Sequence, residues 1–169
     1  REVSSMGNFT IDLPSIDAAT ALSGPGNSSL KKFEFLTGVS FAIRGLQLEL
    51  TGTASKLEKA SALVELTRPI WEQGIEVPEV DLKAALTSLD LGQESRHAEL
   101  GNKVLAKSNK GKYLRPRTIR QKAYVEAIEK NELTFAIGPA GTGKTFLATV
   151  LAARLLNEKK IEKIVLTRP

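Results

Sequence analysis

The octapeptide from Gly138 to Thr145 constrains the fold of this chain more than any other feature. It reads Gly-Pro-Ala-Gly-Thr-Gly-Lys-Thr and matches G-x-x-x-x-G-K-[S/T], the P-loop or Walker A pattern. Glycines let successive backbone N–H groups turn toward phosphate oxygens, because no Cβ blocks the approach. The first turn of the following helix adds further N–H groups and a favourable dipole. The pattern therefore predicts a strand, a phosphate-binding loop and a helix in direct succession.

The flanking sequence fits that succession. Residues 133–137 (Leu-Thr-Phe-Ala-Ile) form a short apolar run that predicts a strand leading into the loop. After the loop, an apolar stripe at helical spacing predicts a helix that packs through Phe146, Val150, Leu151 and Leu155. Residues 161–167 predict a second strand, so the whole segment is expected to form a βαβ unit with parallel strands and a right-handed crossover.

Each part of the motif has an expected role in binding ATP and Mg²⁺. Lys144 would reach the β- and γ-phosphates, and the Thr145 hydroxyl would ligate Mg²⁺. The expected nucleotide-binding set is Gly138, Pro139, Ala140, Gly141, Thr142, Gly143, Lys144 and Thr145. A Walker B aspartate has no candidate, because no later strand follows, and the sequence identifies no catalytic residue. The plain alternative is a glycine turn that merely precedes a helix.

A second candidate for the nucleotide site lies upstream. Residues 117–128 have the pattern of an amphipathic helix that ends near Asn131. This helix carries Gln121 and resembles the arrangement in helicase-like NTPases, in which a glutamine contacts the adenine edge. A carboxamide can donate to and accept from adenine at the same time. From the spacing alone, a surface glutamine on a packing helix is an equally good interpretation.

The first half of the chain predicts a small α+β module. Alternation predicts strands at 8–13, 39–43 and 46–50, the last two forming a hairpin around Arg44-Gly45. Helices are expected at 16–22, capped by Ser15, and from Ser28 or Ser29 to a stop at Gly38. A longer helix should start near Ala54 and kink or end at Pro69, and another should run from Pro78 to Leu89.

This order, βααββα, resembles the type I KH domain, a module that binds RNA and DNA through a glycine loop between its first two helices. Here that loop would be residues 24–27 (Gly-Pro-Gly-Asn), with Asn27 where the family has its second glycine. Asparagine tolerates a left-handed backbone, so the turn can be retained. The alternative is a degenerate module that serves as a docking surface.

Charge divides the chain. Residues 1–100 hold 9 Lys and Arg against 14 Asp and Glu, whereas residues 101–169 hold 15 against 5. No acid lies between Glu99 and Glu126, and two tyrosines, Tyr113 and Tyr124, accompany the basic segment from Lys103 to Lys122 as a small stacking platform. Such a segment is either a solvated connector or a contact for the backbone of single-stranded RNA.

Composition excludes several classes of protein. The chain of 169 residues is 41% hydrophobic, has no cysteine and contains no apolar run near the ~20 residues of a membrane span. Disulfides and thiolate metal sites are excluded, which fits a cytoplasmic setting. Arg1 in place of Met, and an end at Pro169 directly after a strand-like run, suggest a segment of a longer protein.

We also expect Trp71 to pack in a core and His97 to lie on the surface.

Three stretches together resemble the PhoH-like, phosphate-starvation-inducible family of P-loop ATPases. They are residues 117–128 (Arg-Thr-Ile-Arg-Gln-Lys-Ala-Tyr-Val-Glu-Ala-Ile), the octapeptide 138–145, and residues 166–169 (Leu-Thr-Arg-Pro). The resemblance implies a KH-like module at 8–92, a basic linker at 93–116 and a helicase-related P-loop domain at 117–169 that ends after its second strand.

The resemblance also implies a function. It implies ATP binding with Mg²⁺, contact of Gln121 with adenine, a cytoplasmic role in RNA metabolism, and ATP hydrolysis by the complete protein, which would continue into the strands that supply Walker B. Two alternatives remain open: a non-catalytic nucleic-acid-binding module, or an inactive gene fragment. Oligomerisation of the complete protein is also left open.

Overall fold

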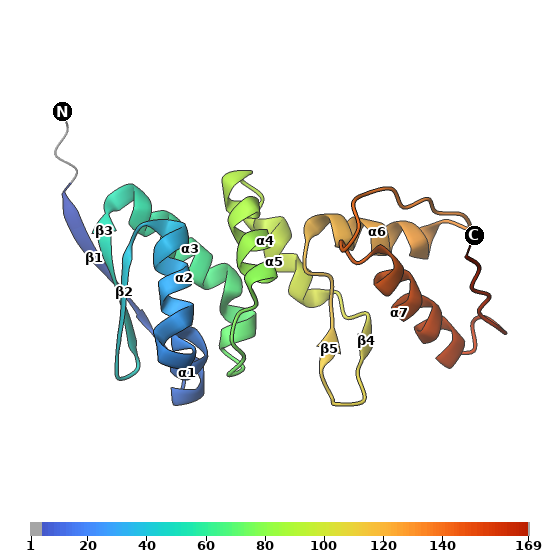
Figure 1. Cartoon of the computed structure of the whole chain (residues 1–169), viewed down its shortest axis with the longest axis horizontal. Helices are drawn as coiled ribbons and strands as arrows, with labels where there is room; N and C mark the ends of the chain where they lie inside the picture. Colours follow the sequence, from blue (N-terminus) through green and yellow to red (C-terminus); the bar gives the residue numbers. More distant parts are fainter. Residues whose placement is uncertain (1–4, 169) are drawn as a thin grey trace. The chain divides into compact units, whose positions relative to one another are not determined.

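The computed structural model describes residues 5–168 and divides into two compact units, with the boundary between Glu94 and Ser95 (Figure 1). The first unit contains strands β1 (Met6–Asp12), β2 (Ser40–Arg44) and β3 (Gln47–Thr53). Its helices are α1 (Ile16–Ser23), a 3₁₀ turn at Pro25–Asn27, α2 (Ser28–Thr37), α3 (Ala54–Trp71) and α4 (Glu79–Asp90). The predicted order of strands and helices is confirmed through α3, with α4 also present.

The three strands form one antiparallel sheet in the order β1-β3-β2. The register sets Leu50 of β3 between Phe9 of β1 and Phe41 of β2. Alternate residues of β3, Leu48 and Leu50, are fully buried, as a sheet with one covered face requires. In Figure 1 the helices lie to one side of this sheet.

Local capping explains most of the element ends. The Ser15 hydroxyl accepts a hydrogen bond from the Ala18 N–H at 3.1 Å, which confirms the predicted N-cap of α1. Gly38 ends α2 with a φ of 66°, as predicted. The expected cap at Ser28 or Ser29 is wrong: Asn27, with a φ of 61°, precedes α2, and the Ser29 hydroxyl donates instead to Glu76 at 2.7 Å. Ser29 is buried, and its hydroxyl bonds a residue distant in the sequence instead of capping the helix.

Pro69 does not end α3. It lies in the last turn of the helix, which continues to Trp71. The core beneath this helix includes Leu22, Phe33, Leu63 and Trp71, all with fully buried side chains. The Trp71 indole N–H donates to the Val64 carbonyl oxygen at 2.9 Å, which satisfies its one polar atom. The expectation that Trp71 packs in a core is confirmed.

The second unit is smaller. It contains α5 (Glu94–Ala98), which begins at the boundary, a 3₁₀ turn at Glu99–Asn102, the hairpin strands β4 (Ala106–Lys107) and β5 (Tyr113–Leu114), α6 (Ile119–Lys130) and α7 (Lys144–Asn157). Its core consists of Leu105, Val125, Leu147 and Leu151. Residues 93–116, expected to be a linker, thus carry helical turns and a hairpin, and Leu105 anchors that hairpin in the core.

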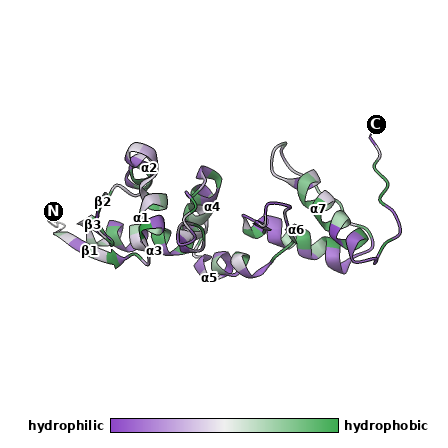
Figure 2. Ribbon diagram, turned by 90° about the horizontal axis from the view of Figure 1, so that it is seen from below, coloured by the Kyte–Doolittle hydropathy of each residue, from purple (hydrophilic) through white to green (hydrophobic). Residues whose placement is uncertain are grey.

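Three expectations for the second unit are wrong. Among residues 5–168, segments 133–137 and 161–167 form no strand, and Phe135 and Leu166 are 82% and 81% exposed. A strand needs a hydrogen-bonded neighbour, and neither segment has one, so their hydrophobic residues lie along extended chain (Figure 2). In the apolar stripe of α7, Leu151 is buried and Val150 packs against the same core, as predicted, but Phe146 is 57% exposed and Leu147 is buried in its place. His97 is buried in α5, not exposed.

Within residues 5–168, no helix combines the length and the apolar character that crossing a membrane requires.

Because Trp71 is the only tryptophan and is buried in the first unit, its fluorescence reports the unfolding of that unit. We expect Leu63→Ala to lower the free energy of unfolding by about 2–5 kcal/mol, since it leaves a cavity beneath α3. Ile16→Ala, at a position that is 75% exposed, should change it by less than ~0.5 kcal/mol. Urea titrations that gave equal values for the two variants would contradict the assigned core.

Candidate nucleotide-binding site

The loop before α7 has the backbone that the motif requires. Gly141 and Gly143 adopt φ values of 76° and 88°, in the left-handed region that other residues rarely enter. Gly143 is the N-cap of α7, and its carbonyl oxygen accepts the Leu147 N–H at 2.9 Å, which closes the first turn. The unpaired N–H groups of that turn therefore face the loop, where an anion can bind them.

Lys144 folds back onto this loop. Its ammonium donates to the Gly138 carbonyl oxygen at 2.8 Å, and also to the Pro139 carbonyl oxygen and the Thr142 hydroxyl. The Thr142 hydroxyl in turn donates to the Pro139 carbonyl oxygen at 3.0 Å. The charge of Lys144 is thus held by neutral carbonyl groups, which a phosphate could replace with a stronger, charge-assisted bond.

Thr145 is exposed in the first turn of α7, directly after Lys144. A threonine hydroxyl is one of the hard oxygen ligands that Mg²⁺ accepts, and Mg²⁺ commonly completes its shell with water and substrate phosphates. Among residues 5–168, no group of three or more His, Cys, Asp and Glu side chains could hold a metal ion. The ligand that this loop offers a cation is the Thr145 hydroxyl, and a bound polyphosphate would add oxygen ligands.

Gln121 connects α6 to the loop. Its side-chain oxygen accepts the Arg117 N–H at 2.7 Å, and its side-chain nitrogen donates to the Thr142 carbonyl oxygen at 3.1 Å. The Thr118 hydroxyl caps α6 by accepting a hydrogen bond from the Gln121 N–H at 3.0 Å. This bond holds the backbone of Gln121 in the first turn of the helix. The structure thus places Gln121 beside the octapeptide, as a nucleotide site containing both would require.

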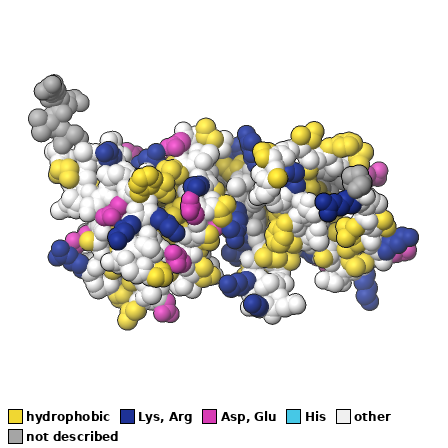
Figure 3. All heavy atoms as spheres, viewed as in Figure 1, with side chains coloured by type: hydrophobic (Ala, Val, Ile, Leu, Met, Phe, Trp, Pro, Cys, Tyr) yellow, Lys and Arg dark blue, Asp and Glu magenta, His cyan; other side chains and the backbone are white. Residues whose placement is uncertain are grey.

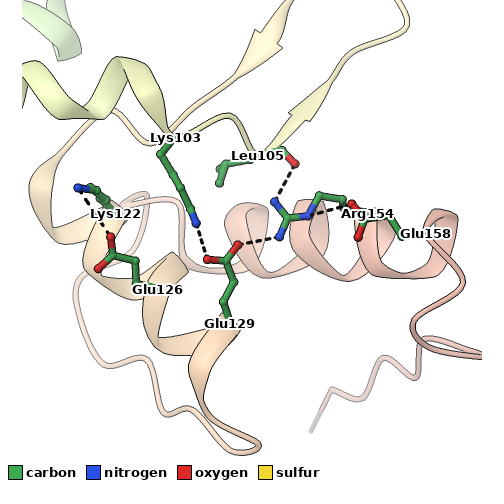
Figure 4. Close-up of polar contacts among 7 residues, drawn as sticks. All are labelled: Lys103, Leu105, Lys122, Glu126, Glu129, Arg154 and Glu158. Carbon is green, nitrogen blue, oxygen red and sulfur yellow. Dashed lines mark hydrogen bonds and ion pairs between the residues drawn. The ribbon is translucent and has the colours of Figure 1, made fainter.

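A charged cluster that the sequence did not reveal lies behind the site. The Glu129 carboxylate accepts from Lys103 and, at 2.7 Å, from Arg154 of α7 (Figure 4). Arg154 also donates to the Leu105 carbonyl oxygen at 3.4 Å. Burial by itself would raise the pKa of Glu129, but the hydrogen bonds and charges of Lys103 and Arg154 hold it below its usual value. Glu129 therefore ties the hairpin segment and α7 to α6.

The basic segment divides into paired and exposed parts. Lys122 lies 3.1 Å from Glu99 and 3.7 Å from Glu126, so both it and Lys103 serve internal ion pairs. Around the hairpin, by contrast, Lys107 and Arg115 lie 5.7 Å and 5.5 Å from the centre of the Tyr113 ring. That ring is 56% exposed.

Known proteins match this chain along most of its length. A family model described as PhoH-like protein matches residues 113–169, which include α6, the loop and α7. A PhoH-like protein of Synechocystis sp. is 39% identical over 160 residues, covering 95% of this chain, and one of Bacillus subtilis is 35% identical over 153 residues, covering 90%. The chain belongs to the PhoH-like family.

The chain spans about half the length of these PhoH-like relatives, 49% and 48% respectively. A shorter match, to Protein PhoH of Escherichia coli, is 46% identical over 46 residues, or 27% of this chain. Membership in the PhoH-like family, expected from the octapeptide and its flanking stretches, is therefore confirmed. No comparison assigns a role to any residue of the site.

The Glu129 cluster generates a prediction about acid stability. Because the folded-state pKa of Glu129 lies below its unfolded value, the carboxylate stabilises the second unit above about pH 4.3. This contribution is lost as the pH falls through the folded-state pKa. We expect Glu129→Gln to lower the melting temperature of α6 and α7, followed by their amide NMR signals, at pH 7, and to lower it by less as the pH is reduced to 3.

Glu132→Gln, at an exposed position two residues beyond α6, is the matched control and should leave the melting temperature unchanged at both pH values. If Glu129→Gln lowered the melting temperature equally at pH 7 and pH 3, the stabilising role of the charge would be disproved.

Proposed function

We propose that this chain binds ATP with Mg²⁺ through residues 138–145, as the nucleotide-binding part of a longer P-loop protein. The observation that carries the proposal is the geometry of the octapeptide: two left-handed glycines, Gly141 and Gly143, lead directly into the N-terminus of α7. Lys144 stands at the first position of that helix. This arrangement suits a polyphosphate, because backbone N–H groups, helix dipole and ammonium all favour negative charge at one point.

Binding would exchange the partners of Lys144. Its ammonium would leave the carbonyl oxygens of Gly138 and Pro139 and donate to phosphate oxygens, a stronger interaction since the acceptor is charged. The Thr145 hydroxyl would hold Mg²⁺, which neutralises the β- and γ-phosphates when bound. Membership in the PhoH-like family supports this proposal, because the matched residues include the whole octapeptide.

The adenine is the proposed partner of Gln121. The Gln121 carboxamide donates a hydrogen bond to the Thr142 carbonyl oxygen, so it lies among the residues that would surround the nucleotide. To contact adenine, the side chain would exchange the Thr142 carbonyl oxygen, the Arg117 N–H, or both, for the donor and acceptor of the base edge.

Hydrolysis belongs to the proposal for the longer protein alone, in which further strands would supply an acidic residue for Mg²⁺. A cytoplasmic setting for that protein is part of the same proposal. An inactive fragment is not favoured, because the octapeptide is intact and similarity to relatives extends over 95% of the chain.

The nucleotide proposal predicts that Lys144→Ala weakens Mg·ATP binding about 10- to 100-fold, the value of one charge-assisted bond. Isothermal titration calorimetry measures the affinity. Lys130→Ala removes an exposed lysine from the last turn of α6 and should bind as the parent does. Equal affinities for parent and Lys144→Ala would rule the site out.

A second function, binding of single-stranded RNA, is favoured by the Tyr113 ring and the two cations that flank it. The exposed Tyr113 ring, with Lys107 and Arg115 over it, offers a base an aromatic partner for stacking and its phosphates a counter-charge. Lys110 and Lys112, in the turn of the same hairpin, add positive charge. This proposal is independent of the nucleotide site.

A KH-like identity of the first unit is part of the same proposal. The βααββα order and the left-handed backbone at Gly24, Gly26 and Asn27 support it. The loop itself carries no basic residue, so we assign the principal RNA contact to the hairpin, not to residues 24–27.

The RNA proposal predicts that Tyr113→Ser weakens binding of a fluorescent 12-residue oligouridylate about 5- to 100-fold, the value of stacking one base. Fluorescence anisotropy at several salt concentrations measures this, and the affinity should fall steeply as salt rises. Phe135→Ser, which removes another exposed ring of the second unit, is the control. Binding that is insensitive to Tyr113 or to salt would contradict the assignment.

A further inference from the structure

A groove between α2 and α4 in the first unit belongs to none of the functions proposed above. It encloses about 380 Å³ and is lined by Lys31, Lys32, Phe35, Leu36, Glu79, Leu82 and Lys83. Leu82 is fully buried and Leu36 is partly buried, so these residues form an apolar floor. Phe35 is 88% exposed, an unusual position for a large aromatic side chain.

Positive charge is concentrated at this groove. Residues 1–94 contain 8 Lys and Arg against 13 Asp and Glu, yet three of those lysines line the groove with a single acid. Lys83 pairs with that acid, Glu79, at 2.6 Å along α4. The hydrogen bond and charge of Lys83, together with the charge of Lys32, hold the pKa of Glu79 below its usual value, so Lys32 of α2 faces α4. Figure 3 shows hydrophobic and basic side chains side by side over this face of the first unit.

We propose that the groove between α2 and α4 binds an acidic amphipathic helix of a partner protein. Two neighbouring helices with an apolar floor accept the apolar ridge of a third helix. The 10 residues of α2 and the 12 residues of α4 make the groove roughly 15–18 Å long, enough for about three helical turns. Acidic residues beside the ridge would meet Lys31, Lys32 and Lys83.

A polyanion such as RNA fits this groove less well. Most of the lining surface is apolar, and the net negative charge of residues 1–94 repels a nucleic-acid backbone that extends beyond the three lysines. A short acidic helix avoids that repulsion because its negative charges do not extend beyond the groove. The main driving force for binding is the burial of Phe35 and of the apolar side chains of the bound helix.

The test is an NMR titration of the ¹⁵N-labelled chain with a designed peptide of about 14 residues, with Leu at positions i, i+4 and i+7 and Glu on both flanks. A twin peptide with Lys in place of Glu, and a 12-residue oligouridylate, are titrated in parallel. We expect the acidic peptide alone to shift amide signals of residues 31–36 and 79–83, with a dissociation constant below about 1 mM at low salt.

Phe35→Ser and Lys32→Glu should each weaken that binding about fivefold or more, whereas Ile16→Ser and Lys56→Glu, exposed positions outside the groove, should not. The proposal is overturned if the acidic peptide leaves these signals unchanged, if the basic twin shifts them equally, or if the oligouridylate shifts them instead.

Discussion

The packing of α7 against α6 is the interaction on which the candidate site depends. Leu147 and Leu151 of α7 share one small core with Val125 of α6 and Leu105 of the hairpin segment. This contact places Gly143, at the start of α7, beside Gln121, near the start of α6. Gly143 has a φ of 88°, which favours glycine, and a Cβ there would lie 3.2 Å from the Gln121 side-chain nitrogen and displace that carboxamide slightly. The end of the loop that leads into α7 is held beside α6 as a result.

Charge reinforces that small core. Four buried hydrophobic residues provide limited stabilisation, and Glu129 adds to it by joining Lys103 and Arg154 from either side of α6. The side chains of this cluster are less than one-third exposed, so solvent screens them less than it screens ordinary surface pairs. The segment that carries the basic hairpin is therefore attached to the same framework as the loop before α7, through side chains that are not themselves part of either proposed site.

Sequence predicted the parts of the structure that local rules determine. The cap at Ser15, the stop at Gly38, the hairpin around Gly45 and the order of elements in the first unit all follow from short patterns. The helix after Gly143 follows from the octapeptide in the same way. Contacts between distant residues were not predictable from these patterns: the Ser29–Glu76 bond spans 47 positions, and the Glu129 cluster joins three separate segments.

The failed strand predictions have the same origin, because an apolar run specifies a strand only where another strand can pair with it. Residues 133–137 lie next to the loop, yet their backbone conformation depends on a neighbour that the sequence pattern does not identify. Gly141 and Gly143 adopt positive φ values without a neighbouring strand, because this conformation depends only on the freedom of glycine and on the start of α7.

Hydrogen–deuterium exchange of the chain with and without Mg·ATP shows whether residues 138–145 bind the nucleotide. If residues 138–145 bind the nucleotide, exchange should slow in peptides that contain the loop and the first turn of α7, and in those containing Gln121, while the first unit stays unchanged. Identical exchange of the loop and of α7 in both samples, at a nucleotide concentration of several millimolar, would contradict nucleotide binding by residues 138–145.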